Sequence, residues 1–181
     1  MAQTRNGNAE VEEKESLMTI ADTSRQVVSS MSDMVWSINP NRDNLRDTIQ
    51  RMRRFASEVL TAKDIRFTFD TPDDEKEIKL DVDLRRQLYL IFKESINNAA
   101  KYSECTLVKI ELKRKADGIF LKISDNGIGF NVDKNTYGNG LRNMKMRAEE
   151  VGGKYRITSE KGKGTLVELK LPRRIGGFAI N

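Results

Sequence analysis

The sequence contains no histidine and only one cysteine among its 181 residues. The single Cys105 excludes a disulfide within the chain and fits a reducing compartment. No uninterrupted apolar stretch reaches the roughly 18 residues that a membrane-spanning helix requires, and the amino terminus has no secretory signal pattern. We therefore expect a cytoplasmic protein, or the cytoplasmic part of a membrane sensor whose membrane segment lies outside this chain.

Proline and glycine are also scarce, at 3 and 12 residues, whereas 33% of the residues are charged and 38% are hydrophobic. This balance is typical of one small domain with an extension, built from a modest core and long solvated helical faces. The formal net charge of +5 suits a polyanionic ligand such as a nucleotide. Ordinary solvated Lys and Arg side chains explain that charge equally well.

The first third of the chain has helical periodicity. Residues 1–15 are polar and are expected to be a disordered terminus or the artificial end of a recombinant chain. A heptad-like stripe follows, made of Leu17, Ile20, Ser24, Val27, Met31, Met34 and Ile38. Pro40 ends this helix, and Asp43 opens a second amphipathic one whose apolar positions are Leu45, Ile49, Met52, Ala56 and Val59. We expect residues 16–62 to form a helical hairpin whose apolar seam needs a partner chain or another helix.

The rest of the chain combines strand and helix patterns. Strand-like stretches occur at 65–70, 77–80, 106–113, 118–125, 155–158 and 165–171, and helical periodicity occurs at about 83–102 and 139–151. Asp81 or Asp83 is expected to cap the first of these helices. The order predicts an α+β domain over residues 63–174, with a mixed, mostly antiparallel sheet covered by helices, and a tail over 175–181.

The helix predicted at 83–102 carries three residues with complementary chemistry. Glu94 and Asn98 are one turn apart on one face, and Lys101 is the next neighbour. An amide oxygen can bind magnesium, a carboxylate can orient a water, and an ammonium can neutralise phosphate charge. By themselves, these residues could equally form a solvated helix face.

Three glycine-containing segments follow in order. Asp125-Asn-Gly127-Ile-Gly129 ends a strand, where Asp125 can accept a hydrogen bond from an exocyclic amine and the glycines allow close approach to a flat ligand. Gly138-Asn-Gly140-Leu141 opens a helix, whose free N–H groups attract phosphate. Gly162-Lys-Gly-Thr165 forms a turn from which Thr165 can reach Asp125 or a base, through a water.

Each segment alone has an ordinary explanation as a turn, a helix start or a polar face. Their order, each on a suitable element, favours a site for ATP with Mg²⁺. A dinucleotide-binding fold does not fit, because the glycine pattern is incomplete and its surroundings do not form a parallel βαβ unit.

These motifs resemble the N box and glycine boxes of the GHKL ATPase superfamily, which has the Bergerat ATP-binding fold. The resemblance covers about Ile65 to Pro172. Within the superfamily, the segment from Gly138 to Gly153 and the short interval from Asn131 to Tyr137 are similar to short-lid sensor histidine kinases related to nitrate and lipid-fluidity sensors. The stretch from Met31 to Pro40 resembles the second helix of the dimerisation domain of such kinases.

The resemblance implies ATP and Mg²⁺ as ligands. It implies Glu94 as the catalytic residue, Asn98 as the magnesium ligand and Lys101 as a phosphate contact. Asp125 would bind the adenine amine and Thr165 would support the base. Gly127, Gly129, Gly138, Gly140 and Leu141 would shape the pocket and its lid. Tyr102 stands where many relatives carry a histidine.

The resemblance further implies transfer of the ATP γ-phosphoryl group to a histidine, for relay to an aspartate of a response regulator. Since this chain has no histidine, the acceptor would lie outside it, and this chain alone would not autophosphorylate. A homodimer formed through the helical segment is expected in the full-length protein.

Two alternatives remain open at this point: a serine kinase of the anti-sigma type with the same fold, and an ATP-gated binding module like those of gyrase or mismatch-repair relatives. Nucleic-acid binding is not expected, since the cluster from Arg51 to Arg54 suits a solvated helix face.

Overall fold

The computed structural model describes residues 44–72, 78–132 and 139–172 continuously, together with separate positions between residues 17 and 36. Contacts divide the chain into two compact units, Met1–Asn39 and Pro40–Asn181. In the first unit the described residues are helical, and its described apolar stripe residues, namely Leu17, Ile20, Val27 and Met31, are exposed. Met34, Ile38 and the predicted terminal segments 1–15 and 175–181 lie outside the described residues.

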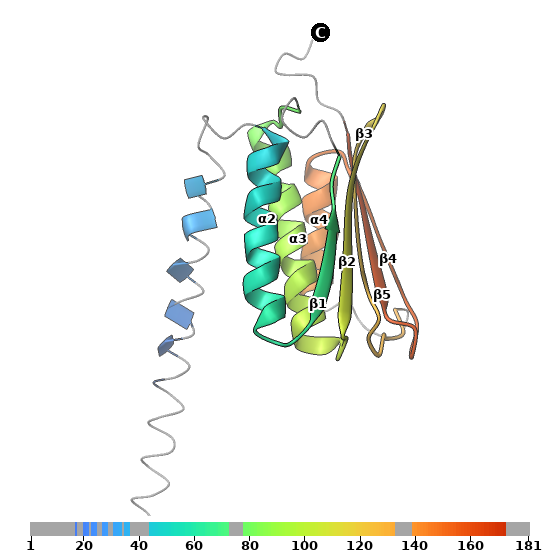
Figure 1. Ribbon diagram of the computed structural model, residues 1–181. Coiled ribbons are helices and arrows are strands. Elements are labelled where there is room, and N and C mark those ends of the chain that lie inside the picture. Colours follow the sequence, from blue (N-terminus) through green and yellow to red (C-terminus); the bar gives the residue numbers. More distant parts are fainter. Residues whose placement is uncertain are drawn as a thin grey trace, which may run out of the picture. The chain divides into compact units, whose positions relative to one another are not determined.

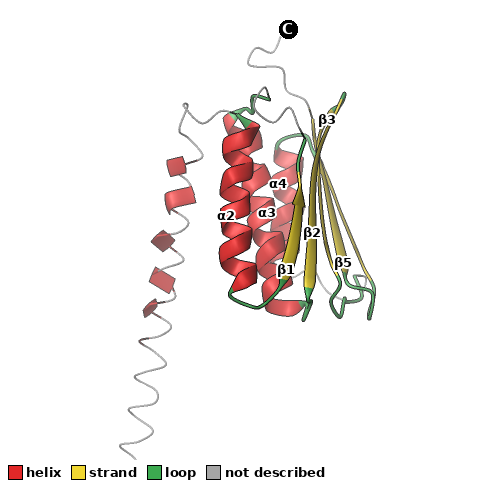
Figure 2. Ribbon diagram, in the orientation of Figure 1, coloured by secondary structure: helices red, strands yellow, loops and turns green. Residues whose placement is uncertain are grey.

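The second unit is a two-layer sandwich, with three helices on one face of a five-stranded sheet (Figures 1 and 2). Its elements are α2 (Leu45–Thr61), β1 (Arg66–Asp70), α3 (Val82–Tyr102), β2 (Leu107–Lys115), β3 (Gly118–Asp125), α4 (Asn139–Glu150), β4 (Lys154–Ser159) and β5 (Thr165–Pro172). The strand order is β1-β2-β3-β5-β4, in which only the β1–β2 pair is parallel. The predicted α+β fold with a mostly antiparallel sheet is confirmed.

Local capping signals set where the helices begin. Asn44 caps α2 by accepting a hydrogen bond from the N–H of Asp47 at 2.8 Å, one residue later than the predicted start at Asp43. Asp81 caps α3 as predicted, accepting from the N–H groups of Asp83 and Leu84. The strand predicted at 77–80 is wrong for its described residues, because Lys79 forms only an isolated bridge with Asn44.

Helix α3 lies at the centre of the helical layer, and its side chains Leu88, Ile91, Phe92 and Ile96 are fully buried. The Phe92 ring packs against Phe55 of α2 and Phe69 of β1, with ring centroids 6.5 and 5.9 Å apart.

Helix α2 belongs to the same compact unit as the sheet. Its buried residues, Leu45, Thr48, Ile49, Met52, Ala56 and Leu60, lie on the side that packs against α3 and β1. The sequence predicts that this apolar face is part of the seam of a hairpin over residues 16–62, whereas in the structure it packs within the unit that begins at Pro40. Periodicity identifies an apolar face but does not say which neighbour covers it.

Two arginines of α2 contact aromatic side chains of the same unit, although the sequence predicted a solvated helix face for them. The Arg51 guanidinium lies 5.0 Å from the centre of the Tyr89 ring, and the Arg53 guanidinium lies 4.7 Å from that of Phe69. Arg53 also donates a hydrogen bond to the Phe69 carbonyl at 3.0 Å. Within the cluster from Arg51 to Arg54, Arg53 and Arg54 are exposed and Arg51 is half-buried.

The topology brings the four predicted motif segments to one end of the sandwich, the lower end in Figure 1. Helix α3 and strand β3 both finish there, helix α4 begins there, and the β4–β5 turn closes the same end. Along the described part of the chain, no helix is both long and apolar enough to span a bilayer.

Candidate nucleotide-binding site

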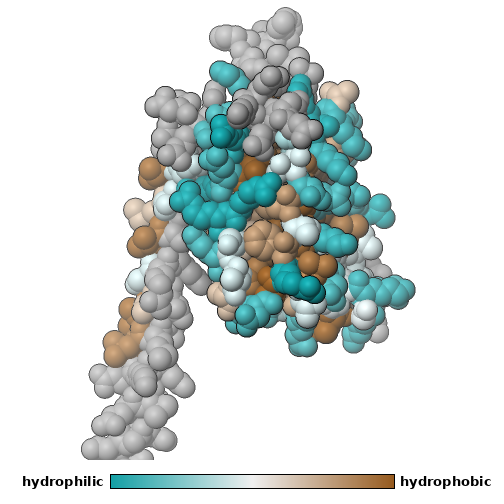
Figure 3. Space-filling view, in the orientation of Figure 1, coloured by the Kyte–Doolittle hydropathy of each residue, from teal (hydrophilic) through white to brown (hydrophobic). Residues whose placement is uncertain are grey.

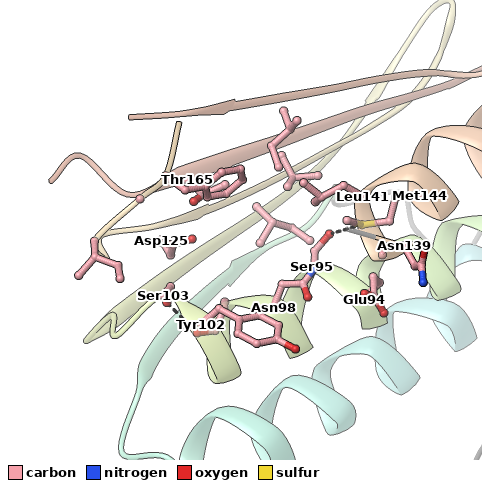
Figure 4. Close-up of a pocket in the computed structure, with 18 residues that line it drawn as sticks. Glu94, Ser95, Asn98, Tyr102, Ser103, Asp125, Asn139, Leu141, Met144 and Thr165 are labelled. Atoms are coloured by element: carbon pink, nitrogen blue, oxygen red, sulfur yellow. Dashed lines mark hydrogen bonds between the residues drawn. The ribbon is translucent and has the colours of Figure 1, made fainter. Parts of the chain in front are cut away.

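A cavity of about 720 Å³ lies at this end, between α3, α4 and the inner face of the sheet (Figure 4). Its size is that of a small-molecule pocket. The predicted site residues that line it are Glu94, Asn98, Asp125, Gly129, Gly140, Leu141 and Thr165. Residues that are far apart in the sequence therefore line one cavity, as the order of the motifs predicted.

Helix α3 presents Glu94 and Asn98 to the cavity, as Figure 4 shows. Lys101 is exposed and does not line the cavity. At 100° per residue, the lining positions 94, 95, 98, 99 and 102 centre on a direction that leaves residue 101 at the edge of this face. A ligand would therefore have to meet Lys101 at the rim.

Asp125 lies on the opposite wall, at the end of β3 beside Thr165 (Figure 4). Its Oδ1 accepts a hydrogen bond from the N–H of Gly127 at 2.9 Å. Burial raises the pKa of the Asp125 carboxyl, while hydrogen bonds from Gly127 and from the backbone and hydroxyl of Thr165 oppose that rise. The Thr165 hydroxyl itself shares a hydrogen bond with the Ser159 hydroxyl at 3.1 Å.

We expect Asp125→Asn to raise the melting temperature at pH 7. Because the folded-state pKa of Asp125 lies above the ordinary value of 3.8, the ionised carboxylate destabilises the folded protein, and this cost grows as pH rises through that region. Below the ordinary value the carboxyl is protonated in both states and the cost disappears. Thermal melts of both proteins between about pH 3 and pH 7 should therefore converge at the acidic end. A stability difference that is independent of pH would contradict this account.

The loop after Asp125 is held closely on two sides. Gly127 is buried against the carbonyl of Ser103, which would collide with any side chain at residue 127. Gly129 has a positive φ of 58°, which favours glycine, and it packs against the carbonyls of Glu160 and Gly164. The predicted glycines therefore place this loop between the end of α3 and the β4–β5 turn.

The first turn of α4 forms the third wall. Asn139, Gly140 and Leu141 line the cavity, and a Cβ at Gly140 would collide with the carboxylate of Glu94. Glycine at this position therefore lets the start of α4 approach α3 closely. Gly138 lies outside the described residues.

Met144 anchors α4 behind this first turn. Its sulfur accepts a hydrogen bond from the Ser95 hydroxyl of α3 at 3.4 Å, drawn as a dashed line in Figure 4. The Tyr155 hydroxyl of β4 approaches the same sulfur at 4.0 Å. At the C-terminal end of α4, Gln87 of α3 donates to Glu150 at 2.8 Å and accepts from Arg147 at 3.3 Å. These contacts fix the helix that carries Gly140.

Apart from Leu141, the apolar part of the lining was not among the site residues predicted from the sequence. It comprises Ile123, Ile128, Leu141, Met144, Ile157 and Val167, together with the ring of Tyr102 at the exposed rim. Alternation along a strand cannot show that Ile123, Ile157 and Val167 face a cavity. Figure 3 shows apolar surface gathered in the lower half of the sandwich, toward this end.

The cavity has two chemically different ends, and apolar side chains line the space between them. Asp125 and Thr165 form an acceptor-rich end suited to an amine-bearing ring, whereas Glu94, Asn98 and the start of α4 form an end suited to a metal-bound phosphate. Within the described ranges, no cluster of three or more His, Cys, Asp or Glu residues could hold a metal ion. Asn98 could offer one neutral oxygen to a magnesium ion, which accepts such a ligand together with phosphate oxygens and waters.

Comparison with known proteins agrees with this geometry. The family model of histidine kinase-, DNA gyrase B- and HSP90-like ATPases matches residues 83–175, slightly more than half of the chain. The part of the sandwich that contains the cavity is therefore an ATPase domain. This chain belongs to the histidine kinase-, DNA gyrase B- and HSP90-like ATPase family.

Curated relatives are sensor proteins. The sensor protein VraS of Staphylococcus saprophyticus is 40% identical over 100 residues, which cover 55% of this chain and 29% of that protein. The sensor protein VraS of Staphylococcus aureus is also 40% identical, over 98 residues. This chain spans less than a third of the length of these relatives.

Solved structures show the same fold at low sequence identity. The histidine kinase AdeS of Acinetobacter baumannii aligns with a TM-score of 0.64 and 17% identity, covering 87% of this chain and 82% of that chain. The histidine kinase domain of a blue-light activated kinase from Erythrobacter litoralis aligns with a TM-score of 0.59 and 17% identity, covering 69% and 60%.

Proposed function

We propose that this chain is the ATP-binding catalytic portion of a cytoplasmic sensor histidine kinase, or of the cytoplasmic part of a membrane sensor. The observation that carries the proposal is the cavity itself, in which Glu94 and Asn98 face the start of α4 while Asp125 lies at the opposite end. The sensor-protein relatives support the same assignment.

In this proposal the residues divide the work by position. Asp125 accepts a hydrogen bond from the adenine amine, Thr165 supports the base, and Gly127 and Gly129 hold the loop between them. Asn98 offers its amide oxygen to Mg²⁺. Glu94 is the acid/base residue of the phosphoryl transfer.

The start of α4 and the rim complete the proposed site. Gly138, Gly140 and Leu141 shape the phosphate end, and Lys101 reaches the phosphates from the rim. Magnesium would neutralise phosphate charge when bound, so the chain's own contribution is mainly positioning.

The phosphoryl acceptor in this proposal is a histidine on another segment or chain, because the sequence itself has none. The phosphoryl group would then pass to an aspartate of a response regulator. The exposed stripe of Leu17, Ile20, Val27 and Met31 supports homodimerisation through the helical segment, since such a stripe is stabilised by a paired helix.

Two measurements test the proposal in sequence. Calorimetric titration with a non-hydrolysable ATP analogue should show saturable binding that magnesium strengthens. Labelled ATP should then transfer phosphate to a longer protein that includes the upstream histidine, giving an acid-labile, base-stable adduct. Absence of binding at millimolar analogue would contradict the ATP site. Label on a serine of a partner protein would instead favour the anti-sigma-type alternative.

A further inference from the structure

One side chain outside the predicted site joins the base-recognition loop to the segment that follows α3. The Oδ1 atom of Asn126 accepts hydrogen bonds from the N–H groups of Thr106 and Leu107, at 3.0 and 2.9 Å. Its Nδ2 donates to the Thr106 hydroxyl at 3.0 Å. All three side-chain hydrogen bonds of this amide are therefore made to Thr106, the last residue before β2, and Leu107, the first residue of β2.

The backbone on either side of Asn126 strengthens this link. The Asn126 N–H donates to the Leu107 carbonyl at 3.3 Å, and the Ile128 N–H donates to the Ser103 carbonyl at 2.8 Å. Ser103 in turn caps α3, because its hydroxyl donates to the Ala99 carbonyl at 2.7 Å and accepts from the Cys105 N–H at 3.2 Å. The loop is thus bonded to the same end of α3 that carries Asn98.

Asp125 and Asn98 lie on separate elements, the first at the end of β3 and the second in the last turns of α3. A nucleotide that contacts both residues gains full binding energy only if the distance between them is set in advance. Asn126 directly follows Asp125 and bonds Thr106, four residues beyond Tyr102, so its bonds add to the pairing of Asp125 with Val108 in fixing the end of β3 beside the end of α3.

We infer that Asn126 is a positioning residue, which holds the adenine-recognition end of the cavity in register with its metal-phosphate end. The inference rests on the proposed function, because it needs a ligand that spans both ends. Asn126 does not line the cavity, and its role is exerted through Asp125.

The key variant is Asn126→Ala, which removes all three side-chain hydrogen bonds. Asn126 is exposed, so water can replace its bonds to Thr106 and Leu107, and we expect the fold to be retained. Affinity for the magnesium complex of a non-hydrolysable ATP analogue should fall about tenfold, because that ligand spans both ends. Affinity for adenosine, which reaches only the Asp125 end, should change less than about threefold.

The two affinities are measured by calorimetry for the analogue and by nuclear magnetic resonance titration for adenosine. Asn143→Ala, an exposed asparagine of α4 that does not line the cavity, is the matched control and should leave both affinities unchanged. Thermal melts establish that each variant is folded.

Selective loss of analogue binding supports the inference. Unchanged analogue binding overturns it, as does an equal loss for both ligands, which would limit Asn126 to the base end. If Asn126→Ala does not fold, Thr106→Val decides the question: it removes one bond and should cause a two- to threefold loss for the analogue alone. Failure of the wild-type protein to bind either ligand would instead count against the proposed function.

Discussion

Asp125→Ala is expected to weaken binding of an ATP analogue about 100-fold, equally with and without magnesium. Asp125 is a partly buried acceptor in the cavity wall, and its Oδ1 already accepts a hydrogen bond from the N–H of Gly127. Removing it leaves the adenine amine without its acceptor in a partly buried site, which costs more than losing an exposed hydrogen bond.

Calorimetry at two magnesium concentrations measures this effect. Asp70→Ala is a suitable control, because Asp70 is an exposed aspartate at the end of β1 that does not line the cavity. A loss that occurs only in the presence of magnesium would assign Asp125 to the metal end and would sink the proposed orientation of the nucleotide.

Asn98→Ala is expected to abolish the strengthening of nucleotide binding by magnesium. Affinity for the magnesium complex should fall about 10- to 100-fold, toward the metal-free value, because one protein oxygen is lost from an ion that takes its other ligands from phosphate and water. Metal-free affinity should stay within about twofold, since the amide has no other proposed contact with the nucleotide.

Asn97→Ala provides a matched control for this variant. Asn97 precedes Asn98 on α3 but is turned about 100° away around the helix, and it does not line the cavity. Similar losses for Asn97→Ala and Asn98→Ala would show a general effect on α3 rather than a metal contact.

The two variants test opposite ends of one cavity, so their comparison is sharper than either alone. Asp125→Ala should reduce affinity in both conditions, whereas Asn98→Ala should act only with magnesium. Equal, metal-independent losses for both variants would contradict the division of the cavity into a base end and a metal end.

The sequence predicted the elements of the second unit well because its local signals are strong. Alternation marked β2, β3 and β5, helical periodicity and the Asp81 cap marked α3, and helical periodicity at about 139–151 marked α4. It also predicted that Glu94 and Asn98 share one face, because a spacing of four residues is a property of the helix itself.

Tertiary packing decided which faces meet. The apolar face of α2 was visible in the sequence, but only the structure shows that α3 and β1 cover it. Likewise, Lys101 belongs to the motif but lies beyond the lining, because the direction of the cavity depends on how α3 is rotated against the sheet and α4.

By itself, the sequence determined the secondary-structure order and the motif residues at opposite ends of the cavity, because capping, alternation and short spacings act over a few residues. Only the tertiary structure decided that Ile123, Ile157 and Val167 form the cavity floor and that Asn126 bonds the connection after α3. Those contacts join residues about 20 or more positions apart in the chain, and their partners are set by how the layers pack.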